Sequence, residues 1–205
     1  MRFARTAVAL VTVVFSVAPS AAVSLFAQTA KQDANGAQPA PSAVAAHGSD
    51  FDYLLGDWEF TGKNQQYGSI HGFWSAVRLG DGGPILDEYR VVGDPGETYY
   101  VTRTLRSWNS HSERWELVST EGSSGLQNLG TGRRDGGEVH IEQKFGVGTP
   151  LVSTLRIRYS NIEADHFSWS ADRSTDGGKT WVTNFQQLDV KRIGPPRTLT
   201  LTKDR

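Results

Sequence analysis

The chain of 205 residues contains no cysteine. Disulfide bonds and thiolate metal sites are therefore excluded, and so is a lipid anchor attached to an N-terminal cysteine. Because no covalent cross-link is available, we expect burial of an ordinary apolar core to supply the stability of the folded chain.

An excess of either charge is also missing. The sequence has 21 Lys and Arg residues against 22 Asp and Glu residues, for a formal net charge of −1. Loss of Arg2 and Arg5 with an N-terminal signal would leave 19 basic and 22 acidic residues. So close a balance gives no electrostatic reason to expect nucleic acid or an anionic membrane as a partner.

Long uncharged apolar stretches are absent except at the start of the chain. Two arginines precede an apolar segment from Ala7 to Val17, and the small residues Ser20-Ala21-Ala22 follow it. This order is typical of a cleaved secretory signal, which we assign to residues 1–27. Pro19 and the Ala/Ser-rich second half argue against a membrane anchor. We therefore expect a periplasmic or secreted protein with no membrane span after cleavage.

Residues 28–49 are rich in Ala, Gln, Pro, Gly and Ser and contain no aromatic residue. Such a segment cannot bury enough apolar surface to offset its ordering entropy, so we predict a disordered linker. We assign residues 50–192 to one folded domain and residues 193–205 to a C-terminal tail, since Pro195-Pro196 ends the pattern described next.

Helical periodicity is missing after Tyr53, and the dominant period is two. In one clear case, Val139, Ile141, Gln143 and Phe145 alternate with charged residues and a histidine. About ten such segments, separated by short turns rich in glycine, predict antiparallel strands. A sheet of that length would expose two unpaired edges unless it closed. We predict an all-β, up-and-down barrel of about eight to ten strands, preceded by a short helical turn within Ser49 to Leu55; a β-sandwich is the alternative.

Catalytic signatures are absent as well. The run Gly122-Ser-Ser-Gly125 lacks the frame of a nucleophile elbow, and no helix follows the glycine-rich turns as a phosphate loop requires. Asp87 and Glu88 point to opposite faces of a strand. No metal-ligand spacing is present, and we expect neither a metal nor another cofactor. The sequence therefore does not favour an enzyme.

The motif Gly56-Asp57-Trp58, placed after a helical turn and at the start of the first strand, resembles the opening motif of lipocalins and the wider calycin group. The resemblance implies that Trp58 plugs the closed end of the barrel, with Gly56 at the turn and a basic residue of the last strand, Arg192 or Lys191, stacked over the indole.

The chain also resembles bacterial domain-of-unknown-function families with lipocalin-like barrels. The shared features are Phe51-Asp-Tyr-Leu-Leu-Gly-Asp-Trp58, the strand Asp87-Glu88-Tyr89, Arg114-Trp115, and a late turn from Asp176 to Trp181. This resemblance covers Phe51 to Arg192; it implies the fold and no particular activity.

The late turn matches the Asp-box pattern Ser-x-Asp-x-Gly-x-Thr-Trp between Ser174 and Trp181. A single copy in a short chain is typical of a structural hairpin, in which Asp176 accepts backbone N–H bonds and Trp181 holds the turn to the body.

Two residues are candidates for ligand binding because they share a parity with apolar neighbours. His71 alternates in step with Phe73, Val77 and Leu79, so it is either a core histidine or a contact to a ligand such as haem, which we considered and did not favour. Arg103 alternates in step with Val101 and Leu105, which predicts a buried guanidinium paired with Glu88 or Asp87, or one that anchors a ligand anion. Further candidates are Glu88, Tyr89, Gln143 and Arg173.

Three functions are compatible with these features. The leading hypothesis is an exported barrel that binds a small hydrophobic or amphipathic molecule. The alternatives are an enzyme that uses the barrel interior, with Arg103 and an acidic neighbour as its polar core, and an envelope module that binds a protein or a glycan through its outer face.

Overall fold

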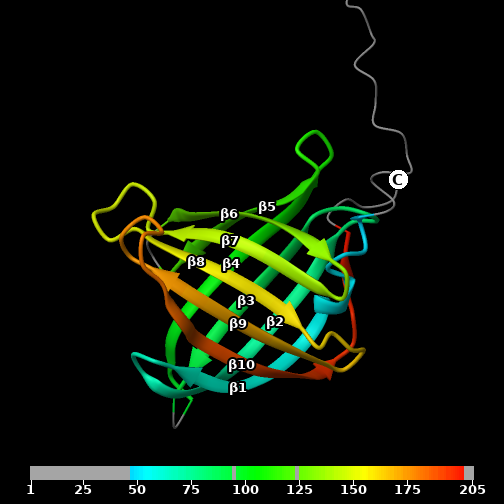
Figure 1. The fold of residues 1–205 in the computed structure, drawn as a ribbon. Coiled ribbons are helices and arrows are strands. Elements are labelled where there is room, and N and C mark those ends of the chain that lie inside the picture. The colour runs from blue at the N-terminus through cyan, green and yellow to red at the C-terminus, as the bar shows by residue number, and fades with distance from the viewer. Residues whose placement is uncertain (1–46, 94–95, 123–124, 201–205) are drawn as a thin grey trace, which may run out of the picture. The chain divides into compact units, whose positions relative to one another are not determined.

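The computed structural model describes residues 47–93, 96–122 and 125–200. The predicted signal and nearly all of the predicted linker lie outside these residues. The described chain begins with a 3-10 turn and continues almost entirely as strand (Figure 1). Its elements are η1 (Asp52–Leu54), β1 (Gly56–Asn64), β2 (Gly68–Leu79), β3 (Ile85–Val92), β4 (Thr98–Asn109), β5 (Arg114–Glu121), β6 (Leu126–Asp135), β7 (Glu138–Phe145), β8 (Ser153–Ser160), β9 (His166–Ser174), β10 (Val182–Gly194) and β11 (Thr198–Leu199).

Ten antiparallel strands close into an up-and-down barrel. Each strand from β1 to β10 pairs with the next one, and β1 also pairs with β10. The predicted all-β barrel is confirmed, and the alternative β-sandwich is wrong. The segment predicted to form a helical turn contains the 3-10 turn η1. The short strand β11 pairs in parallel with Arg78 and Leu79 of β2, just beyond the point where β1 begins.

The two ends of the barrel differ. One end, which we call the closed end, carries η1 and the turns that follow β2, β4, β6 and β8. The other end, the open end, carries the connections that follow β1, β3, β5, β7 and β9 (Figure 1).

Aromatic side chains fill the closed end. Phe51, Trp58, Trp115, Tyr159 and Phe167 are each at most 1% exposed. Their rings meet mainly edge to face, as in the contact between Trp58 and Phe167, whose centroids lie 4.9 Å apart. Such edge-to-face pairs are favoured by the quadrupoles of the rings. The closed half of the barrel is therefore a packed core.

Arginines from three strands tie the segment around η1 to the barrel. Arg78 of β2 donates to the carbonyl oxygen of Gly48 and to the Asp52 carboxylate, and Arg134 of β6 donates to the carbonyl oxygen of Asp50. Arg192 of β10 donates to the carbonyl oxygens of Tyr53 and Leu55 at 2.9 and 2.6 Å. These donors satisfy carbonyls that so short a helical turn leaves unpaired.

Arg192 also stacks on Trp58, with its guanidinium carbon 3.9 Å from the ring centroid. The indole N–H of Trp58 donates to the carbonyl oxygen of Leu54 at 2.8 Å. Gly56, between η1 and Trp58, has a φ of +110°, and a Cβ there would lie 2.6 Å from Nη1 of Arg192. This position therefore needs glycine both for its backbone conformation and for the approach of the arginine.

The hairpin between β9 and β10 is organised by Asp176. Its Oδ1 accepts the backbone N–H groups of Lys179 and Thr180, both at 3.0 Å, and its Oδ2 accepts the Thr180 hydroxyl at 2.7 Å. These bonds hold the pKa of the Asp176 carboxyl at about 2. Trp181 lies under the guanidinium of Arg156 from β8, which is 3.9 Å from the ring centroid.

Candidate functional site

The inner surface of the open half differs from the packed closed half. Ile70, Tyr89, Val91 and Leu155 pack against the core but stay partly exposed. Since these side chains belong to the inner face of β2, β3 and β8, the inner surface is less completely buried toward the open end.

Hydrogen-bonding side chains line one wall of this open half. Ser119 of β5, Asn128 of β6 and Gln143 of β7 are buried, with exposed fractions of 1%, 0% and 6%. The Gln143 amide donates to the Ser119 hydroxyl oxygen at 3.0 Å, across the position of Gly130. A Cβ at Gly130 would lie 3.1 Å from Cβ and Cγ of Gln143, so the missing side chain there makes room for the glutamine.

A second polar group comes from the opposite side of the barrel. The Asn64 amide of β1 donates to Oε1 of Gln186 at 2.8 Å, and the Gln186 amide donates to the Tyr89 hydroxyl oxygen at 3.0 Å. The Tyr89 ring stacks on Phe60, with centroids 4.8 Å apart. Burial raises the pKa of Tyr89, so the hydroxyl stays protonated at neutral pH. Amides, a phenol and aromatic rings thus share the inner surface.

The amide of Asn128 is the least satisfied group of this surface. Its oxygen accepts the backbone N–H of Gly146 at 3.1 Å. Its Nδ2 is buried and has no hydrogen-bond partner among the residues that the structure describes. Leaving a buried donor unpaired costs about 1–3 kcal/mol, so such a group calls for a partner such as a bound water or a ligand atom. Tyr53, Arg106 and Trp108, toward the closed end, also carry buried polar atoms without a partner among the described residues.

A buried ion pair lies nearer the closed end. Arg106 of β4 and Asp87 of β3 are 3% and 2% exposed, and Nε of Arg106 lies 2.6 Å from Oδ2 of Asp87. The indole N–H of Trp74 donates to the same carboxylate at 2.9 Å. Burial alone would lower the pKa of Arg106, but the charge and hydrogen bonds of Asp87 raise it. Arg106 is thus held as a cation inside the barrel.

The prediction that Arg103 is buried is wrong. Thr102, Thr104 and Arg106 form the inner face of β4, and Arg103 points outward with half of its side chain exposed. It pairs with Glu88 at 2.8 Å on the outer surface. The buried arginine that the sequence pattern indicates is therefore Arg106, and its partner is Asp87.

The placement of His71 is also a correction. His71, like Phe73, is exposed on the outer face, while Gly72, Trp74 and Ala76 face the interior. An outward histidine cannot reach a haem held inside the barrel. Arg173 lies near the open end and pairs in register with Leu155, on the inward parity of Trp169 and Ala171. Its guanidinium carbon is 4.9 Å from the Phe185 ring centroid. Of the predicted ligand contacts, the structure thus places Tyr89, Gln143 and Arg173 on the inward-facing parity of their strands.

Residues that the sequence reasoning missed complete the inner surface: Asn64, Ser119, Asn128 and Gln186. The inward parity of β6 offers no apolar marker, because Asn128 shares it with Gly130 and Gly132 while Leu129 points outward. For Arg106 a signal exists, since it shares a parity with Trp108, which packs on the core.

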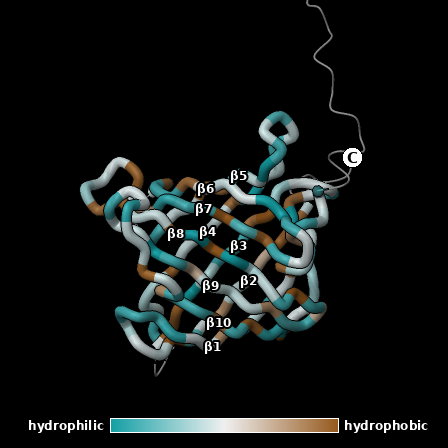
Figure 2. The backbone as a smooth tube through the Cα atoms, viewed as in Figure 1, coloured by the Kyte–Doolittle hydropathy of each residue, from teal (hydrophilic) through white to brown (hydrophobic). Residues whose placement is uncertain are grey.

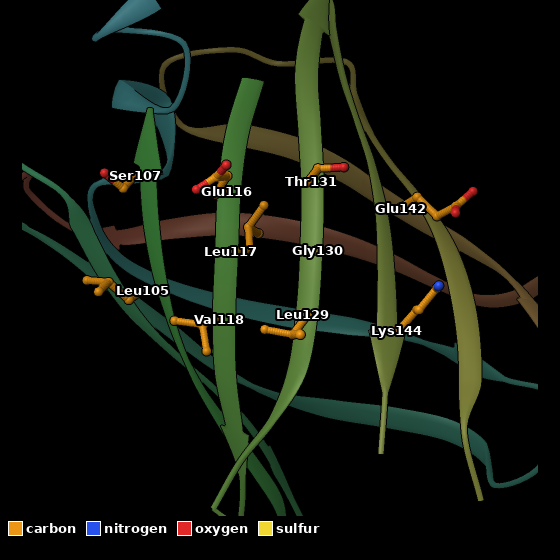
Figure 3. Close-up of a pocket in the computed structure, with 10 residues that line it drawn as sticks. All are labelled: Leu105, Ser107, Glu116, Leu117, Val118, Leu129, Gly130, Thr131, Glu142 and Lys144. Atoms are coloured by element: carbon orange, nitrogen blue, oxygen red, sulfur yellow. The ribbon is translucent and has the colours of Figure 1, made fainter. Parts of the chain in front are cut away.

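The outer wall carries a groove of about 570 Å³ over β4 to β7. Figure 3 shows Leu105, Val118 and Leu129 in one row across neighbouring strands that line the groove. Glu116 and Lys144 belong to its polar lining. The row is part of an apolar belt that crosses five strands in direct register, with the pairs Val77–Leu86, Leu86–Leu105, Leu105–Val118 and Val118–Leu129.

The described residues show neither a metal-binding cluster nor a membrane-spanning helix. No group of three or more His, Asp or Glu side chains among them is arranged to hold a metal ion. No helix in the same part of the chain has the length and apolar character needed to cross a membrane.

Comparisons with known proteins assign no family to the chain. No protein-family model matches the chain, and a search of curated proteins finds no similar sequence. The inner surface has its own chemical character. Its amide and hydroxyl groups can bind a polar atom, and its rings can pack against an apolar body.

Proposed function

We propose that this protein is an exported, lipocalin-like binding barrel that holds one small amphipathic molecule in its open half. The ligand enters at the open end, because aromatic side chains and the arginine-tied segment fill the closed end. The proposal includes export to the periplasm or the exterior and needs no nucleic acid, metal or other cofactor.

The observation that carries the proposal is the amide of Asn128. A buried N–H group with no acceptor among the described residues is unfavourable in the empty protein. A ligand that brings an oxygen to this position would remove that cost. The ligand's polar end therefore carries an acceptor, such as a carboxylate or a carbonyl oxygen.

The apolar side chains of the open half indicate the rest of the ligand. Ile70, Val91 and Leu155 offer apolar surface, and the stacked rings of Phe60 and Tyr89 lie deeper. An apolar chain or ring system fits such a surface, since contact with these side chains removes it from water. An acceptor group at one end and an apolar body at the other define an amphipathic molecule.

A titration with a fluorescent fatty acid, dansylated undecanoic acid, tests this function. The wild-type protein should bind the probe saturably. Asn128→Leu should weaken binding by about tenfold or more, because a hydrogen bond to a charged group contributes about 1.5–3 kcal/mol. The substitution also removes the acceptor of the Gly146 N–H, so we expect it to lower the free energy of unfolding by about 1–3 kcal/mol, and circular dichroism should show that the variant is still folded.

Arg103→Ala is the matched control, because it removes an outward arginine that the sequence alone had placed at the site. It should leave the dissociation constant of the probe unchanged. The proposal fails if the wild-type protein does not bind the probe saturably. It also fails if Arg103→Ala weakens binding while Asn128→Leu does not.

A further inference from the structure

The open end of the barrel exposes large apolar side chains that the core does not use. They comprise one or more residues from each of the five open-end connections or the strand ends beside them. Leu151 is 85% exposed, Tyr67 72% and Leu126 71%. We call this set the apolar rim: Tyr67, Tyr99, Leu126, Val147, Leu151, Val152 and Val182.

The four turns of the closed end provide the contrast. In residues 80–84, 110–113, 136–137 and 161–165 no large apolar side chain is exposed. The two exposed apolar residues nearest this end, Ile193 and Leu199, belong to the C-terminal segment. The connections are polar at one end and tipped with apolar side chains at the other. Figure 2 shows hydrophobic stretches in the connection between β7 and β8.

We propose that the apolar rim docks the open end of the barrel on the surface of a zwitterionic lipid layer. The apolar side chains come from separate connections and surround the open end. A fluid layer can accept several separated tips at once, whereas a protein partner would need a continuous complementary patch. The tyrosines suit this role, because their rings bury at an interface while their hydroxyls stay in water.

The charged residues of the open end indicate whether the lipid surface is neutral or anionic. They carry both signs, among them Lys63 and Lys179 against Glu97 and Asp176. Binding to an anionic layer is strengthened by a cluster of basic residues, and the described part of the open end has a mixture. Apolar contact with a neutral surface is therefore the interaction that this end can make.

This inference rests on the proposed function, because the rim surrounds the entrance through which the amphipathic ligand would pass. With the rim docked, a molecule could move between the lipid layer and the barrel interior without crossing bulk water. The contact is thus a way to load or unload the ligand, since the transfer of an apolar body through water is unfavourable.

Co-sedimentation with phosphatidylcholine vesicles tests the docking. The wild-type protein should bind the vesicles, and Leu126→Asp combined with Leu151→Asp should lower the partition coefficient at least about tenfold. Both side chains are more than two-thirds exposed, so circular dichroism should show an unchanged fold. If the double variant is misfolded, Leu151→Ser alone should still reduce binding.

Ile193→Asp is the matched control, because Ile193 is 54% exposed near the opposite end. It should keep the partition coefficient within about twofold of the wild type. Leu129→Asp, in the apolar belt, should do the same. The inference is overturned if the wild type does not bind, if the double variant binds normally, or if either control loses as much binding as the double variant does.

Asn128→Leu separates this inference from the proposed function. It should lose the fatty acid probe and keep vesicle binding. If no variant or wild type binds the probe but the rim variants lose vesicle binding, the docking stands and the proposed function falls.

Discussion

The Asp87 and Arg106 side chains carry a charge pair through the interior of the barrel. Both charges are almost fully buried, and Trp74 donates a third hydrogen bond to the same carboxylate. Removing one member of a buried pair leaves an unpaired charge, which costs about 3–5 kcal/mol, whereas replacing both members by apolar side chains can be nearly neutral.

We therefore expect Asp87→Leu to lower the free energy of unfolding by about 3–5 kcal/mol. The double variant Asp87→Leu with Arg106→Met should recover a large part of that loss. Urea unfolding of the wild type, the two single variants and the double variant measures the coupling. Strictly additive losses would show that the pair does not act as a unit.

Trp58 is the second residue whose role is local and structural. It is fully buried, bonded to Leu54 and covered by Arg192. Trp58→Ala should lower the free energy of unfolding by about 3–5 kcal/mol, because it empties the centre of the closed end. The folded fraction should still bind the fatty acid probe. If Trp58→Ala is as stable as the wild type but no longer binds the probe, the ligand binds at the closed end, and the proposed location in the open half is wrong.

At the scale of single elements, the alternation of apolar and polar residues predicted the positions of the strands well. It predicted less well which face of each strand points into the barrel. The strand order and the closed end follow from a strong period of two and from Gly56-Asp57-Trp58. The face of β4 was misjudged because Val101 and Leu105 point outward while Thr102, Thr104 and Arg106 line the interior. The rule that apolar side chains point inward and polar ones outward fails in a barrel whose interior is lined by polar side chains and whose outer wall carries an apolar belt.

The hairpin between β9 and β10 gives an element with a defined pH response. The pKa of Asp176 is about 2 in the folded protein, below the ordinary value of 3.8, chiefly because the Thr180 backbone N–H and hydroxyl bond to the charged form. A lowered folded pKa contributes stability above the ordinary value, and that contribution is lost as pH falls toward 2.

Asp176→Asn should therefore be less stable than the wild type at pH 5, with a difference that shrinks between about pH 4 and pH 2. Urea midpoints measured for both proteins across this range check it. Binding of the fatty acid probe at neutral pH should be unchanged, since the Asp176 side chain stabilises the turn of the hairpin and does not belong to the inner surface. A stability difference that does not vary with pH would contradict the assignment.

At the scale of the whole molecule, the barrel divides into two halves with different tasks. The closed half is stabilised by aromatic packing and the arginine contacts to the segment around η1. The open half is packed less tightly, because buried amides and partly exposed side chains such as Ile70, Val91 and Leu155 line its inner face. This division explains why the fold was predictable from alternation while the polar inner surface, built from Asn, Gln, Ser and Gly positions, was not.

Native mass spectrometry of the protein purified from its own host tests the central claim most directly. The wild-type protein should carry one small amphipathic molecule, seen as a discrete mass above that of the mature chain. The Asn128→Leu variant, prepared in the same way, should show little or none of it. A wild-type protein that appears only at the mass of the chain, or an adduct that persists undiminished in Asn128→Leu, would contradict the account.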